Sequence, residues 1–207
     1  MIPAEMTGGW IRHGIALDGA EPVEDAVVWW LQAPSKHCDL RVPFDTDGIE
    51  GLMCFAGTTT WADPSLTWSP ELELDASTAT DVGVIGWDGE DLMESGTFVD
   101  GGRAVSYVER WRRLPHSDGE LLALSRPHGR LVRTGPYALT IVDERPIGGS
   151  FAAIAWTLEN GTWTVDHRWP ASAIAAAPPA AVTGAGTTVV LSDGVEWSID
   201  EHRSTRH

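Results

Sequence analysis

The chain has 207 residues, 43% of them hydrophobic, and a formal net charge of -16. A chain of this length can bury a substantial core in one domain without disulfides or a metal. The negative charge repels phosphate backbones and anionic lipid surfaces, so nucleic acid and membranes are excluded as expected partners.

Targeting and redox signals favour a cytoplasmic protein. The opening residues MIPAEMTGG lack a basic segment followed by an apolar one, and no window approaches the roughly eighteen apolar residues of a membrane-spanning helix. Cys38 and Cys54 have no CxxC spacing, which favours reduced thiols over a disulfide framework or a zinc site. We therefore expect the cytoplasm as the location.

Turn residues divide the chain into short segments of alternating polarity, with hardly any helical period. This pattern is typical of antiparallel strands. The expected strands are residues 9–17, 26–32, 37–42, 49–57, 82–87, 92–99, 103–113, 121–125, 130–134, 137–143, 151–159, 162–169, 187–192 and 195–200, and residues 58–75 alternate around a turn at Asp63-Pro64.

These strands predict an all-β fold. A closed barrel is favoured over a sandwich because several strands place charged and aromatic residues on one face, and a lumen can hold both. We expect a single β-barrel domain over residues 1–207, with an Ala/Pro-rich connection at 170–186 and a flexible tail at 201–207. The chain also has 11 Trp, which either fill a core or line a pocket for a flat, apolar ligand.

The first candidate site lies on residues 37–42. Successive strand residues point to opposite faces, so His37, Asp39 and Arg41 share one face while Cys38 and Leu40 share the other. If the charged face looks into a cavity, it forms a site. A buried salt-bridge network or a solvated strand face explains the same pattern.

The second informative strand is residues 103–113. Its other face carries two arginines and a serine, so we expect Tyr107, Glu109 and Trp111 to point inward. A carboxylate between two aromatic rings has a raised pKa unless it is paired with a cation, and Arg41 is the candidate partner.

A hairpin is expected around Asn160-Gly161, because both residues tolerate the positive φ of a type I′ turn. A two-residue loop fixes the register, which places Trp156 opposite Val165 and Ile154 opposite His167. His167 then lies on an apolar, Trp-rich face, where a core histidine is a simpler explanation than a ligand contact.

Other chemistry has little sequence support. The histidines lack HxH and HExxH spacing, so no metal site and no cofactor is expected, although a single axial histidine (His13, His37 or His167) leaves haem as an alternative. The glycines at 83–86 lack the strand-loop-helix setting of a phosphate loop, and Ser95 lacks the GxSxG motif.

Several short motifs carry a family resemblance: Trp10 and Arg12, then the segments 30–32 (WLQ), 39–43 (DLRVP) and 107–111 (YVERW). They resemble a poorly characterised family of bacterial and fungal proteins over roughly the first 140 residues. Fungal members are known mainly as partners of a casein-kinase-I-type kinase, and the family looks like calycins, the superfamily of lipocalin-type barrels. The resemblance implies a calycin/lipocalin-like antiparallel barrel with an internal cavity. It gives no agreed activity, so no catalytic residue can be carried over from the family.

Three functions remain open. The first is a binding barrel that holds a small, largely apolar or aromatic molecule in a Trp-lined cavity, with Arg41 and its neighbours orienting a polar end of that molecule. The second is a cofactor-independent enzyme (isomerase, dehydratase, cyclase or hydrolase) with His37 or Glu109 as base and Tyr107 as acid. The third is a protein-interaction scaffold with a filled barrel. A second copy of the chain, in a homodimer, is left open as a partner. The expected ligand-binding residues are Arg41, Asp39, Trp30, Trp111, Trp10, Trp156 and His167.

Overall fold

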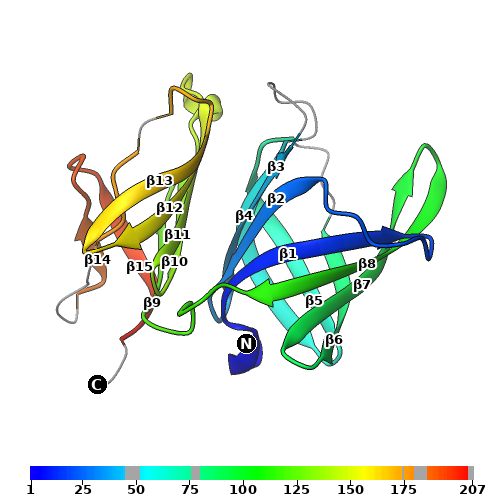
Figure 1. Ribbon diagram of the computed structural model, residues 1–207. Helices are drawn as coiled ribbons and strands as arrows, with labels where there is room; N and C mark the ends of the chain where they lie inside the picture. The colour runs from blue at the N-terminus through cyan, green and yellow to red at the C-terminus, as the bar shows by residue number, and fades with distance from the viewer. Residues whose placement is uncertain (45–51, 76–79, 174, 180–185, 205–207) are drawn as a thin grey trace.

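The structure is a computed structural model that describes residues 1–44, 52–75, 80–173, 175–179 and 186–204. Its strands form two antiparallel sheets that lie side by side (Figure 1). The first eight strands close into a barrel in sequence order. The other seven form a sheet with the order β13-β12-β11-β10-β9-β15-β14. The prediction of an all-β chain with an antiparallel barrel is confirmed.

The described elements alternate strand and turn along nearly the whole chain. The barrel contains β1 (Gly8–Leu17), β2 (Ala26–Gln32), β3 (Lys36–Pro43), β4 (Met53–Ala62), β5 (Ser65–Glu73), β6 (Asp81–Asp88), β7 (Asp91–Asp100) and β8 (Arg103–Arg113). The second sheet contains β9 (Leu121–Arg126), β10 (Gly129–Thr134), β11 (Tyr137–Asp143), β12 (Phe151–Glu159), β13 (Thr162–Trp169), β14 (Thr188–Val190) and β15 (Glu196–Arg203), and two short 3-10 helices are η1 (Ala4–Met6) and η2 (Arg145–Ile147).

Turn chemistry explains why the strands were placed well from sequence. At the β12–β13 hairpin, Asn160 has φ 50° and Gly161 has φ 79°, as a type I′ turn requires. The strands at 26–32, 103–113, 137–143, 151–159 and 162–169 have the predicted bounds. Of the strand predicted at 49–57, residues 49–51 lie outside the described residues, and β4 begins at Met53.

The barrel interior holds an apolar cluster built around tryptophan. Trp10, Trp30 and Trp111 are at most 2% exposed, and they pack with Leu66, Leu92 and their neighbours. Ile2 and Met6, before and within η1, belong to the same cluster. The N-terminal segment therefore covers one end of the barrel.

A second cluster joins the barrel to the other sheet. Cys38 and Leu40 of β3 point outward and pack in one buried cluster with Leu139 and Ile141 of β11. The predicted alternation of residues 37–42 is therefore observed. Both cysteines are free and buried.

The sequence interpretation placed every strand in one barrel, whereas the barrel described here ends at Arg113 and β9–β15 form the second sheet. Alternating polarity shows that a segment is a strand but not which sheet it joins, so alternation alone does not separate the two sheets. Residues 201–203, expected in the tail, complete β15 and pair with β9. Among the described residues, no helix has the length and apolarity needed to cross a membrane.

Candidate ligand-binding site

Strand β3 delivers a carboxylate and a guanidinium to the barrel interior. Asp39 is 3% exposed, and the Arg41 side chain, the more exposed of the two, is 18% exposed. Arg41 Nε donates a hydrogen bond to Asp39 Oδ1 over 3.0 Å. Burial raises the pKa of Asp39, although the charge of Arg41 opposes the shift.

A second guanidinium, from Arg12 on β1, enters the same interior. Its Nη1 donates to Glu109 Oε1 over 2.8 Å, and its Nη2 lies 2.8 Å from Glu24 and 3.1 Å from Asp25. Glu109 is 2% exposed and lies 3.7 Å from Nη1 of Arg41. The sequence prediction that Arg41 pairs with Glu109 is thus met, but Arg12 is the closer partner.

Glu94 on β7 is an interior carboxylate that the sequence analysis missed. The Tyr107 hydroxyl donates to its Oε1 over 2.9 Å, and Trp111 Nε1 donates to its Oε2 over 3.2 Å. Burial, together with the charges of Glu109 and Asp81, raises the pKa of Glu94 well above its usual range.

A usable sequence signal existed for Glu94. It shares the inward face of its strand with Leu92, two positions earlier, whereas Ser95 points the other way. On the neighbouring strand, a Cβ on Gly83 would lie 2.7 Å from Glu94 Cγ, so glycine leaves the room this side chain needs.

Indole rings form the wall of the site. The Trp30 ring lies 5.5 Å from both Trp68 and Trp111 in edge-to-face geometry, and 6.1 Å from Trp10. Trp30 Nε1 donates a hydrogen bond to Gln32 Oε1 over 3.0 Å. The cluster is therefore packed as a core, with the indole faces adjoining the charged groups.

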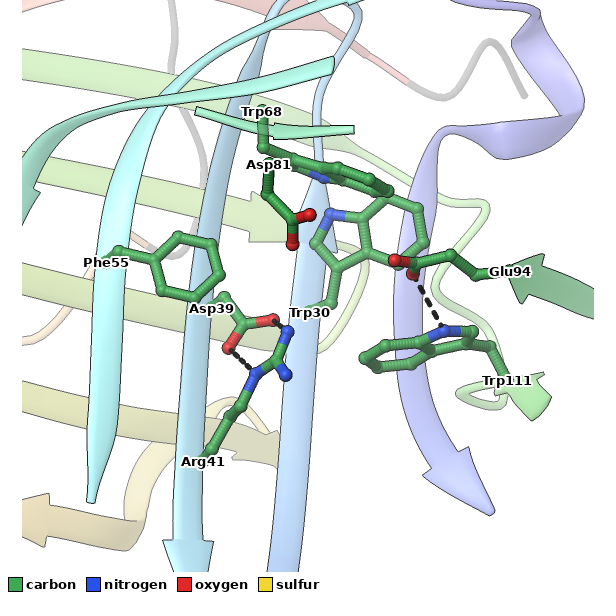
Figure 2. Close-up of a pocket in the computed structure, with 8 residues that line it drawn as sticks. All are labelled: Trp30, Asp39, Arg41, Phe55, Trp68, Asp81, Glu94 and Trp111. Carbon is green, nitrogen blue, oxygen red and sulfur yellow. Dashed lines mark hydrogen bonds and ion pairs between the residues drawn. The ribbon is translucent and has the colours of Figure 1, made fainter. Parts of the chain in front are cut away.

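These groups meet at one small pocket (Figure 2). The carboxylates of Asp39, Asp81 and Glu94 point toward its centre, and the Arg41 guanidinium lies beside Asp39, to which it is hydrogen-bonded. The remaining space is about 10 Å³, roughly the room for one water molecule. The pocket is lined by Trp30, Asp39, Arg41, Phe55, Trp68, Asp81, Glu94 and Trp111.

The predicted catalytic residues do not meet in this pocket. His37 points inward on β3, but its Nδ1 is hydrogen-bonded to Thr59 Oγ1 at 2.9 Å and its ring is not part of the lining. Burial, with a smaller effect from Lys36, lowers the pKa of His37 to about 3, so the ring is a weak base. The Tyr107 hydroxyl donates its hydrogen bond to Glu94 rather than to Glu109.

Two of the predicted ligand-binding residues lie outside the barrel, in the second sheet. A bulge in β13 shifts the register, so His167 pairs with Ala155 rather than Ile154. The shift moves His167 to the face that packs on the barrel, where its ring lies 6.2 Å from Trp29. Trp156 packs in a cluster on the opposite face of this sheet. The predicted shared Trp-rich face of these two residues is wrong because the bulge reverses it.

Of the other residues predicted to bind a ligand, Asp39, Arg41, Trp30 and Trp111 line the pocket, whereas Trp10 is buried in the barrel core and is not part of the lining. Its Nε1 donates to Met6 O over 3.0 Å, at the end covered by η1. No group of three or more His, Cys, Asp or Glu side chains is placed to hold a metal ion in the described part of the chain. The haem candidates are dispersed, since His13 is exposed and His37 and His167 lie in different sheets.

Comparisons with known proteins agree with the barrel. The profile of the family described as Protein HRI1 matches residues 10–201. The crystal structure of the uncharacterized protein YLR301w from Saccharomyces cerevisiae has a TM-score of 0.78, with 95% of this chain and 99% of that chain covered at 14% identity. At that identity the likeness concerns the fold alone. A comparison with curated proteins found no significant match.

Proposed function

This chain belongs to the HRI1 family, and from that premise we propose that its barrel binds a small molecule with an apolar or aromatic body and a cationic group. The pocket of Figure 2 is the proposed site. The observation that carries the proposal is the composition of its lining, in which three indoles and a phenyl ring surround three carboxylates. Aromatic faces and carboxylates both attract cations.

The interior charges favour a cation over an anion. Four carboxylates, from Asp39, Asp81, Glu94 and Glu109, face this region, against two guanidiniums, that of Arg41 in the pocket and that of Arg12 on Glu109. Three of these carboxyls, those of Asp39, Asp81 and Glu94, have raised pKa values, because burial, which is the largest cause for each, and neighbouring acids disfavour their charge. A bound cation would stabilise the ionised forms.

Arg41 occupies the position that we assign to the cation of the ligand. Its guanidinium contacts Asp39 and lies 5.6 Å from the centre of the Phe55 ring. Because the free space is about 10 Å³, a ligand larger than water enters only when Arg41 swings toward the barrel mouth. In the sequence interpretation Arg41 orients the ligand, whereas here the ligand replaces it.

The test is a titration followed by intrinsic tryptophan fluorescence. The probes are 2-phenylethylammonium, 2-phenylethanol and 3-phenylpropanoate, which share a phenyl group and differ in charge. We expect saturable binding of the ammonium at least about tenfold tighter than that of the other two, equivalent to about 1.4 kcal/mol. Stronger binding of the propanoate, or no response to any probe, would contradict the proposal.

Matched variants separate the roles of the arginines. Arg41→Met empties the cation position and is expected to tighten ammonium binding, whereas an anion-orienting Arg41 would make the same variant lose binding. Arg112→Met is the control, because Arg112 is half exposed on the outer face of β8. Its affinity should equal that of the unaltered protein. The probe preference of the unaltered protein decides the outcome if Arg41→Met does not fold.

The filled interior favours a protein-interaction scaffold as the second candidate. Its partner class would be the casein-kinase-I-type kinases implied by the family resemblance, and its barrel would bind no probe. A calycin relationship and a cytoplasmic location are part of both proposals, supported by the eight-stranded barrel and by the two free, buried cysteines respectively.

A further inference from the structure

The barrel interior holds its two guanidiniums in different ways. The Arg12 side chain is 6% exposed, and its nitrogens lie 2.8 to 3.1 Å from three carboxylates. The Arg41 side chain is 18% exposed, and its contacts with carboxylate oxygens are longer, at 3.0, 3.4 and 3.7 Å. Arg12 is therefore held tightly in place, whereas Arg41 is the guanidinium that a competing cation displaces more easily.

The partners of Arg41 together form a receptor for a planar cation. Its Nε donates to Asp39 Oδ1 over 3.0 Å and its Nη2 donates to Asp39 Oδ2 over 3.4 Å, so both oxygens of one carboxylate engage the guanidinium (Figure 2). The third nitrogen, Nη1, lies 3.7 Å from Glu109 Oε1. The central carbon lies 5.6 Å from the centre of the Phe55 ring. Each nitrogen of the group thus faces a carboxylate, and an aromatic ring adjoins its carbon.

This arrangement selects a guanidinium over an ammonium. Two N–H groups of a guanidinium match the two oxygens of a carboxylate, which adds geometric specificity as well as energy. The planar group also stacks on aromatic rings, and it is more weakly hydrated than an ammonium, so it loses less on leaving water. An ammonium is a compact, strongly hydrated point charge without this fork. We therefore expect the receptor to distinguish the two cations.

The charges around Arg41 leave room for a further cation. The interior carries four carboxyl groups against two guanidiniums. One of these acids, Asp81, lines the same pocket and interacts electrostatically with Arg41. A ligand cation on Asp39 would therefore leave Arg41 a carboxylate partner within the pocket.

We propose that the ligand of the barrel pocket is a small-molecule guanidine, whose guanidinium takes the place of Arg41 on Asp39, Glu109 and Phe55. This inference rests on the proposed function, because it names the cation of that ligand. A free small molecule is favoured over an arginine of another protein, since only about 10 Å³ is open beside the packed indoles. The tethered Arg41 competes at a high effective concentration, so a protein without this arginine should bind guanidinium more tightly.

The first measurement compares head groups in the unaltered protein by intrinsic tryptophan fluorescence. The probes are 2-phenylethylguanidinium and 2-phenylethylammonium, which share a body, and N-acetylarginine N-methylamide, which represents an arginine of a protein. We expect 2-phenylethylguanidinium to bind at least about tenfold tighter than the other two. Equal or tighter binding of the ammonium overturns this inference and leaves the proposed function intact. Tighter binding of the arginine amide overturns the small-molecule assignment, and no response to any probe overturns the proposed function as well.

The second measurement empties the receptor. Arg41→Ala removes the atoms of N-ethylguanidinium, so this cation should raise the melting temperature of the variant saturably by at least about 2 °C, and n-propylammonium by at most about half as much. Arg110→Ala is the control, because Arg110 also pairs with two carboxylates but is 37% exposed on the outside of the barrel. Its melting temperature should not respond. Equal rises in both variants, or no rise in Arg41→Ala, overturn the proposal.

A third variant tests the carboxylate that engages two nitrogens. Asp39→Asn keeps the shape of the side chain and leaves one acceptor oxygen, so the preference for guanidinium over ammonium should fall from about tenfold to less than about threefold. A preference that stays at about tenfold in this variant overturns the assignment. If either interior variant does not fold, the probe preference of the unaltered protein decides the outcome.

Discussion

Arg12 offers the sharpest test of how the barrel interior is held together. Its side chain is 6% exposed and bridges Glu24, Asp25 and Glu109, and Glu109 is itself 3% exposed in its side chain. Arg12→Met keeps an unbranched apolar stem of similar shape and removes the charge. Glu109 would then retain one cation, Arg41, at 3.7 Å.

The expected cost follows from burial. Removing one partner of a buried ion pair destabilises a protein by about 3–5 kcal/mol, because the remaining buried charge loses its closest partner and water does not replace it. A chain of this length has a urea m-value near the upper end of the usual range, about 2.5 kcal/mol/M, so the unfolding midpoint should fall by roughly 1–2 M. The two sheets share a buried cluster, so one transition is expected.

The matched control is Arg110→Met. Arg110 also pairs with two carboxylates, Asp88 and Asp91, but its side chain is 37% exposed on the outside of the barrel. Exposed pairs contribute little and are screened by salt. Urea titrations of both variants at low and high salt give the comparison. Equal midpoints for Arg12→Met and Arg110→Met would refute the reasoning that burial decides the contribution.

Three further predictions concern other buried groups. Because the pKa of Glu94 is raised, the folded state holds a proton that the unfolded state releases, so stability should fall as pH rises above about 4.5. Glu94→Gln should flatten this fall in melting temperatures measured between pH 4 and pH 8. An unchanged slope in the variant would contradict the prediction. Burial raises the pKa of Cys38 and of Cys54, so both thiols should react with a disulfide reagent only after unfolding in guanidinium, and rapid reaction of the native protein would contradict this. Trp30→Ala should cost about 3–5 kcal/mol in urea unfolding, because it opens a cavity amid three other indoles, and a loss below about 1 kcal/mol would show that the cluster is loosely packed.

Much of the candidate site was readable from strand alternation. His37, Asp39 and Arg41 were placed on one face, and Tyr107, Glu109 and Trp111 on the inward face of their strand, as the structure has them. Period-two patterning is a local property, so a strand with correct bounds gives the correct faces. Glu94 follows the same rule on β7, where alternation with the exposed face places it inward together with Leu92.

Residue pairing was harder to predict because it depends on neighbours far away in sequence. The bulge between Ala155 and Trp156 on the paired strands moved His167 to the other face, although the turn at Asn160 was correct. The closer partner of Glu109 is Arg12, which is 97 residues away, rather than the predicted Arg41. Packing decides both the register shift at the bulge and which of the two arginines lies closer to Glu109.

The sequence by itself determined the strands, their turns and the polarity of each face, since these depend on residues a few positions apart. Only the tertiary structure decided where the barrel closes, because β8 pairs with β1 across the whole length of the barrel segment. It also decided that β9–β15 form a second sheet on its outer face, with a cavity on the far side. Alternation specifies which side of a strand is buried, and the contacts between sheets specify what that side is buried against.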